Sequence, residues 1–160
     1  MLHELKTIIL NLLFQGSWGC VGGSQASAYM YIKFNNGIAS SEEYPYQGND
    51  SYSCRFNAHS TVGTTTGYTR IPRGNETLLK NIVAAVGPVA FGMDASMASF
   101  ASYSSGVYFE PNCPQNLGHS ATIIGYGNDN ATGLDYWLVK NRYIVIIIFS
   151  LILILIKTIN

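Results

Sequence analysis

Hydrophobic and polar residues alternate with two different periods along this chain, and the two periods predict both helices and strands. Apolar residues recur at helical spacing between residues 76 and 86. Asn75 is a suitable N-cap, Glu76 favours the positive end of the helix dipole, and Gly87-Pro88 ends the pattern. We therefore expect a capped amphipathic helix here. Its apolar stripe consists of Leu78, Leu79, Ile82, Val83 and Val86.

A second helix is expected from Ser24 to Asn36. Ser24 is a suitable N-cap and Gly37 a suitable end signal. Between them, apolar residues fall at helical spacing, namely Ala26, Tyr29 and Met30.

Short apolar runs between Gly- and Asn-rich turns predict strands. These runs cover residues Val89–Met93, Val107–Glu110, Ala121–Tyr126 and Tyr136–Lys140. Helices followed by several short strands predict an α+β fold, and 160 residues are enough for one domain with a core.

The two ends of the chain differ from this middle part. Residues 1–14 contain a short apolar run that Asn11 interrupts, so they fit a signal peptide poorly, and a mispredicted or foreign N-terminus is the preferred interpretation. Residues 143–160 form an isoleucine-rich tail, whose apolar run is shorter than the about 20 residues that span a bilayer. We expect this tail to come from another reading frame or unspliced sequence. A tail anchor is the alternative.

Composition excludes some partners. Nine basic and nine acidic residues give no electrostatic case for nucleic acid. The three histidines and three cysteines are dispersed without ligand spacing, so neither a metal site nor a cofactor is expected. Three glycosylation sequons, at Asn49, Asn75 and Asn130, favour a secretory-pathway protein.

Four sequence blocks carry the chemistry, in the order Gly19-Cys20-Val21-Gly22-Gly23, Glu43-Tyr44-Pro45-Tyr46, Leu117–Gly127 and Asp135–Asn141. Together they resemble the papain-like cysteine peptidases, closest to the cathepsin L branch. The resemblance covers residues 15–142 and implies an incomplete papain-like fold, with part of the helical half and most of the antiparallel, barrel-like β half. The 143–160 tail is unrelated to the family pattern.

The resemblance also implies a catalytic pair. A thiol protease needs a thiolate, an imidazole that takes the thiol proton, and a third group that orients the ring. His119 is the candidate base and Asn141 the candidate orienting amide. Two adjacent strands can bring residues separated by 22 positions into contact.

The nucleophile is not in its expected place. Papain-type enzymes carry it in Cys-Gly-Ser-Cys-Trp, about 130–150 residues before the His and Asn. Cys20 follows Gly16-Ser17-Trp18-Gly19, which shares letters with this motif but not their order. By resemblance, Cys20, Cys54 and Cys113 are instead halves of three different disulfide bridges.

Substrate-binding positions are better preserved. Gly22 and Gly23 resemble the segment whose main chain pairs with an extended peptide. The pocket for the second residue before the cut would be lined by Ser24, Gln25, Gly92, Leu117 and Ser120. Ser24 and Gln25 are polar where the family is usually apolar, which puts the usual apolar preference in doubt.

We therefore expect a lysosomal or extracellular, monomeric cysteine-type endopeptidase that acts on peptide or protein substrates, of which this chain is a catalytically incomplete fragment. Two alternatives remain open: a peptide-binding pseudopeptidase and a tail-anchored membrane protein.

Overall fold

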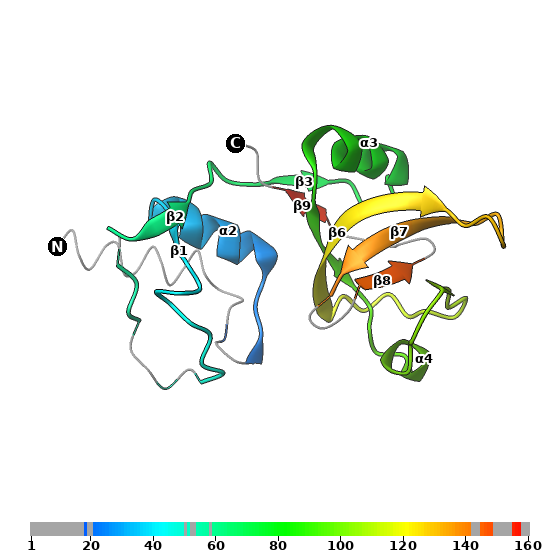
Figure 1. The fold of residues 1–160 in the computed structure, drawn as a ribbon, viewed down its shortest axis with the longest axis horizontal. Coiled ribbons are helices and arrows are strands. Elements are labelled where there is room, and N and C mark those ends of the chain that lie inside the picture. The colour runs from blue at the N-terminus through cyan, green and yellow to red at the C-terminus, as the bar shows by residue number, and fades with distance from the viewer. Residues whose placement is uncertain are drawn as a thin grey trace. The chain divides into compact units, whose positions relative to one another are not determined.

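The computed structural model describes residues 18, 21–49, 51, 54–57, 59–141, 145–148 and 155–157. The chain forms two compact units, Met1–Thr69 with Thr158–Asn160, and Arg70–Lys157. Helices and strands are labelled in Figure 1. The predicted N-terminal segment 1–14 and most of the 143–160 tail lie outside the described residues.

The first unit contains one helix and a two-stranded sheet. Helix α2 spans Gln25–Phe34, close to the predicted range. Ser24 occupies the N-cap position as expected, but its side chain makes no capping hydrogen bond. The sheet pairs β1 (Ile38–Ala39) with β2 (Thr61–Gly63) in antiparallel fashion.

Helix α3 (Glu76–Val86) belongs to the second unit and has the predicted boundaries. The Oδ1 atom of Asn75 accepts a hydrogen bond of 2.9 Å from the backbone N–H of Leu78, which is the expected N-cap. Leu79 and Val83 are buried, whereas Leu78 and Val86 are 37% and 61% exposed. The buried stripe is therefore narrower than the sequence pattern predicted, because only one side of the helix faces the sheet.

A seven-stranded sheet in the order β3-β9-β4-β6-β7-β8-β5 forms the rest of this unit. Its central pairs, β4 with β6 and β6 with β7, are antiparallel, and β5 with β8 is parallel. The strands are β3 (Thr69–Ile71), β4 (Val89–Met93), β5 (Val107–Tyr108), β6 (His119–Asn128), β7 (Asp135–Lys140), β8 (Val145–Ile148) and β9 (Leu155–Lys157).

All four predicted strands are present, with β5 shorter and β6 longer than expected. The sequence did not predict β1, β2, β3 or the one-turn helix α4 (Ala98–Ala101), because these short elements lie outside the apolar runs and helical periods on which the predictions rest. The isoleucine-rich tail, for which no fold was expected, contributes β8 and β9 to the sheet. Within the described residues, no helix is long and apolar enough to cross a membrane.

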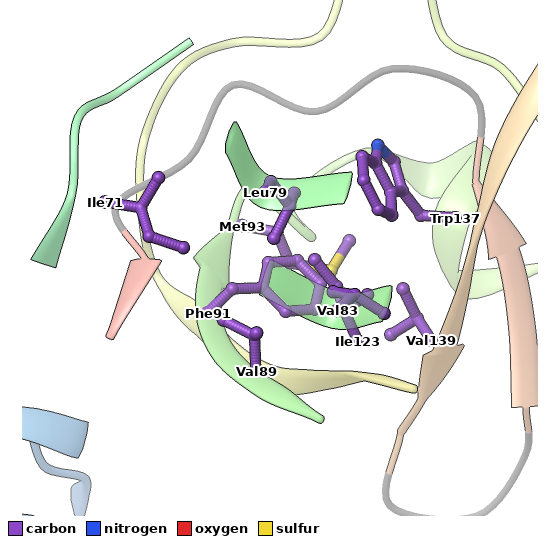
Figure 2. Close-up of a cluster of buried hydrophobic side chains, with 9 residues drawn as sticks. All are labelled: Ile71, Leu79, Val83, Val89, Phe91, Met93, Ile123, Trp137 and Val139. Carbon is purple, nitrogen blue, oxygen red and sulfur yellow. The ribbon is translucent and has the colours of Figure 1, made fainter. Parts of the chain in front are cut away.

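The core of the second unit lies between α3 and the sheet, as Figure 2 shows. Strand β4 alternates between buried and partly buried residues, so that Val89, Phe91 and Met93 all point into this core. Strands β6 and β7 add Ile123, Trp137 and Val139. This packing fixes the three strands whose ends carry the candidate site.

Candidate active site

His119 and Asn141 lie at one end of the β6–β7 pair. His119 is the first residue of β6, and Asn141 directly follows β7. Because the two strands are antiparallel, the start of one lies beside the end of the other. The Nε2 atom of His119 is 2.9 Å from Oδ1 of Asn141, in a partly buried position.

This contact selects the tautomer of the imidazole ring. The amide oxygen of Asn141 only accepts hydrogen bonds, so Nε2 of His119 carries the proton and donates it. In a neutral ring the other nitrogen, Nδ1, is then an acceptor. The arrangement can take a proton from an acidic group placed at Nδ1, as general base catalysis requires.

A surface pocket of ≈ 640 Å³ surrounds the pair. Its lining residues are Pro88, His119, Ser120, Ala121, Thr122, Ile124, Lys140 and Asn141. The ring of Phe100, from α4, lies 6.4 Å from the His119 ring, with the two planes tilted by 59°. An edge-to-face contact with Tyr108 holds Phe100 in turn, at 5.4 Å between ring centroids. His119 is thus supported from two elements.

The structure brings three predicted substrate-binding residues close to His119. Gly92 pairs with Ser120 across β4 and β6, one position from the pair of Met93 with His119. A Cβ atom at Gly92 would lie 3.8 Å from Cβ of Leu117. Gly92 therefore lies next to both Leu117 and Ser120, and of these three residues Ser120 lines the pocket at His119.

The other four predicted substrate-binding residues, Gly22, Gly23, Ser24 and Gln25, belong to the first unit. Gly22 has a φ of 142°, a backbone conformation that favours glycine. Its carbonyl oxygen accepts a hydrogen bond of 2.7 Å from the N–H of Trp18. Gly23 and Ser24 then lead directly into α2, which begins at Gln25.

Cys54 and Cys113 are exposed and carry free thiols, while Cys20 lies outside the described residues. The thiol of Cys54 is 3.9 Å from the hydroxyl of Tyr31. Burial, followed by the Cys54 thiol, raises the pKa of Tyr31 to about 12. Burial, with the carboxylates of Asp94 and Glu110, raises the pKa of the Cys113 thiol. Cys113 is therefore poorly suited to be a thiolate at neutral pH.

A profile described as "Papain family cysteine protease" matches residues 11–144. The chain belongs to the papain family of cysteine proteases.

Several curated relatives are cathepsins of the L type. The chain is 49% identical over 129 residues to cathepsin L of Sarcophaga peregrina, covering 80% of this chain and 38% of that protein. It is 47% identical over 129 residues to cathepsin L1 of Drosophila melanogaster, covering 80% of this chain and 34% of that protein. The chain thus spans less than two-fifths of the length of these curated relatives.

Solved structures show the papain-like fold. Digestive procathepsin L2 proteinase from the larval midgut of Tenebrio molitor superposes with a TM-score of 0.83 at 32% identity, covering 93% of this chain and 51% of that chain. Bromelain protease from Ananas comosus, in complex with the E64 inhibitor, gives a TM-score of 0.80 at 30% identity, covering 93% and 75%. The cathepsin L-like resemblance inferred from the sequence blocks is confirmed.

Sequence reasoning missed two residues near the site, Phe100 and Asp94. Phe100 contacts the His119 ring from α4, and Asp94 is a buried carboxylate at the end of β4. Neither belongs to a quoted sequence block, and each contacts a segment many positions away, which no local pattern in the sequence signals. Within the described residues, no cluster of three or more His, Cys, Asp or Glu side chains is arranged to hold a metal ion.

Proposed function

We propose that this protein takes part in cysteine-type endopeptidase chemistry, with His119 as general base and Asn141 as the residue that orients it. The observation that carries the proposal is the 2.9 Å bond between Nε2 and Oδ1, which leaves Nδ1 as the acceptor. A thiol at Nδ1 would lose its proton to the ring and attack the peptide carbonyl carbon. The imidazolium would return that proton to the amine nitrogen as the C–N bond breaks, which leaves the acyl-enzyme, and water would then hydrolyse the thioester.

The nucleophile is proposed to lie in a Cys-Gly-Ser-Cys-Trp block elsewhere in the gene product. Cys113 has a raised thiol pKa, and neither it nor Cys54 lies in such a motif. Cys20 follows Gly16-Ser17-Trp18-Gly19, and its Gly22-Gly23 context supports a bridging role. On this proposal the chain supplies the base and the orienting amide but is catalytically incomplete alone.

The proposed substrates are peptides or proteins in an extended conformation. Gly92, Leu117 and Ser120 lie beside His119 and would line the pocket for the second residue before the cut. Gly22 and Gly23 would pair with the substrate main chain, with Ser24 and Gln25 adding polar contacts. The names of relatives, a digestive cysteine proteinase and cathepsins among them, support a secreted or lysosomal location together with the three sequons.

A pseudopeptidase that binds peptides without cutting them is the second candidate. One specific observation favours it: the 160 residues contain His119, Asn141 and the substrate-binding positions, but no Cys-Gly-Ser-Cys-Trp sequence.

An active-site probe separates the two candidates. The full gene product, expressed from its complete transcript, is treated with a biotinylated epoxide or vinyl-sulfone peptide. We expect covalent labelling that His119→Ala abolishes and that His59→Ala leaves intact, since His59 is exposed and far along the sequence from the site. Peptide binding without labelling would instead establish the pseudopeptidase.

The chain of 160 residues provides the matching negative test. Purified alone, it should not hydrolyse a fluorogenic peptide amide. Hydrolysis that disappears in the Cys20→Ser variant would place the nucleophile at Cys20 and contradict the proposal.

A further inference from the structure

Asp94 directly follows β4 and is only 9% exposed. Its Oδ1 atom accepts hydrogen bonds from the backbone N–H of Ser96 at 2.9 Å and from the Ser96 hydroxyl at 2.6 Å. Its Oδ2 atom accepts a third bond, of 2.8 Å, from the backbone N–H of Asn116. The first two bonds are local, whereas the third joins residues separated by 22 positions.

The third bond reaches the chain that leads into β6. Asn116 lies three positions before His119, and its carbonyl oxygen accepts a bond of 2.8 Å from the N–H of Gly118. Asn116 is therefore held on both sides, by Asp94 and by Gly118. Leu117 lies between these two anchored residues and faces Gly92.

The strand register places this bond next to the candidate base. Met93, the residue before Asp94, pairs with His119 across β4 and β6. The last residue pair of β4 and β6 is Met93 with His119. The Asp94–Asn116 bond adds a further link between the two chains beyond that pair, in the residues that precede β6. A charge-assisted bond is suited to this task because it is about twice as strong as a neutral one.

We propose that Asp94 is a positioning residue, which fixes Asn116 and thereby sets the place of Leu117 and the entry of His119 into β6. This inference deepens the proposed function, because Leu117 is one wall of the proposed substrate pocket. The carboxylate touches neither substrate nor reacting atoms. It acts through the backbone of residues 116–118.

The electrostatics of Asp94 agree with this geometry. Hydrogen bonds from the hydroxyl and then the backbone N–H of Ser96, together with that of Asn116, hold the pKa of the carboxyl below its ordinary value, against the effect of burial. The carboxylate therefore keeps its charge in an acidic compartment. It also stays an acceptor for the N–H of Asn116 there.

Asp129 offers a matched control in the β6–β7 turn. It accepts hydrogen bonds from the backbone N–H and the hydroxyl of Thr132, three positions away. Its pKa is lowered for the same kind of reason, with the Thr132 hydroxyl as the largest cause. The side chain of Asp129 therefore accepts the same two kinds of local bond as Asp94, from a nearby backbone N–H and a nearby hydroxyl. Among the described residues, no side-chain bond of Asp129 to a distant segment is found.

Amide hydrogen exchange on the complete chain tests the proposal. In Asp94→Ala, we expect the amides of Asn116 and Leu117 to exchange about tenfold faster or more, and the imidazole resonances of His119 to shift. Ser96→Ala removes a local donor but leaves the bond to Asn116, so its exchange at Asn116 should stay close to that of the unmodified chain. Asp129→Ala should leave all three residues unchanged.

The proposal is overturned if Asp94→Ala changes exchange at Asn116 and Leu117 no more than Asp129→Ala does. It is also overturned if Ser96→Ala speeds exchange at Asn116 and Leu117 as much as Asp94→Ala does, since the local turn at Ser96 would then account for the whole change.

Peptide binding separates this result from the proposed function. Two labelled peptides that differ only in Leu or Ala at the proposed pocket position are titrated by fluorescence anisotropy. Loss of the Leu-over-Ala preference in Asp94→Ala, but not in Asp129→Ala, supports the proposal, and an unchanged preference contradicts it. If the unmodified chain binds neither peptide, the proposed function fails, and the exchange data still decide the role of Asp94.

Discussion

His119 and Asn141 meet across the end of the β6–β7 pair, with Nε2 of the imidazole 2.9 Å from Oδ1 of the amide. The register of the two strands determines this contact. Thr122 of β6 pairs with Lys140 of β7. Asn141, which follows Lys140, therefore lies close to the first residues of β6, which begins at His119. Ile123 and Val139, which pair within the same register, are fully buried. The core therefore fixes the distance between the two polar residues.

The first prediction concerns the imidazole tautomer. Replacing Asn141 with Leu removes the acceptor for Nε2, and a hydrogen bond contributes about 1 kcal/mol net. We expect the preference for the Nε2–H tautomer to fall about fivefold, as measured from the ¹⁵N shifts of the ring. Asn128→Leu is the control, because Asn128 bonds Asp135 and Gly133 at the opposite end of the same strands. An unchanged tautomer ratio in Asn141→Leu would show that the bond does not orient the ring.

The second prediction concerns pH. The folded pKa of Asp94 lies below its unfolded value of about 3.9, so its contribution to stability is present above that value and is lost as the pH falls through the folded pKa. We expect the amide proton of Asn116 to keep its chemical shift from pH 7 to 5 and to titrate only below about pH 4. Burial, with the carboxylates of Asp94 and Glu110, raises the pKa of the nearby Cys113 thiol, so that its titration moves further from this pH range.

Asp94→Asn is the control for this titration and should abolish the shift change at Asn116. A midpoint above the ordinary pKa of an aspartate would reverse the sign of the argument.

The third prediction compares the two helix N-caps. Asn75 accepts a bond from Leu78, so Asn75→Ala should destabilise α3 by about 1 kcal/mol. Ser24 makes no capping bond, so Ser24→Ala should change the stability of α2 by less than about 0.5 kcal/mol. Hydrogen exchange within each helix measures both effects. Thr77→Ala, which removes the sequon but keeps the cap, shows whether any change at Asn75 comes from glycosylation.

The fourth prediction concerns close packing across β6 and β7. A Cβ atom at Gly127 would lie 2.5 Å from the hydroxyl oxygen of Tyr136, whereas one at Gly125 would lie 3.7 Å from Cβ of Leu138. Gly127→Ala should therefore displace the ring of the half-buried Tyr136, at a cost of roughly 0.5–1.5 kcal/mol for a shifted side-chain torsion. Gly125→Ala should leave Leu138 in place. Cross-relaxation between residue 127 and the Tyr136 ring reports the displacement, and an unmoved ring would contradict the prediction.

Much of the fold followed from local patterns. The helix from Glu76 to Val86 was predictable because Asn75, an apolar stripe and Gly87 all act within a few residues of each other. Strand β4 was predictable because Val89, Phe91 and Met93 alternate over one uniform run. Strands β1 and β2 were not predictable, since no apolar run marks them in the sequence and they are recognised only by their pairing with each other.

The candidate site divides in the same way. Sequence blocks identified His119 and Asn141, because the residue types and their order can be recognised in the sequence alone. The contacts of Phe100 with His119 and of Asp94 with Asn116 could not be predicted from the sequence, since each joins segments separated by many positions.

The sequence by itself determined the family, the two main helices, the strands β4, β5, β6 and β7, and the identity of the candidate base and its candidate orienting amide. It could do so because hydrophobic period, capping and motif order are properties of neighbouring residues. Only the tertiary structure decided that Nε2 of His119 contacts Asn141, that Gly92 lies next to Leu117 and Ser120, and that Asp94 bonds Asn116 ahead of β6. Those facts depend on strand register, which is set by the simultaneous burial of distant apolar side chains around Phe91 and Ile123.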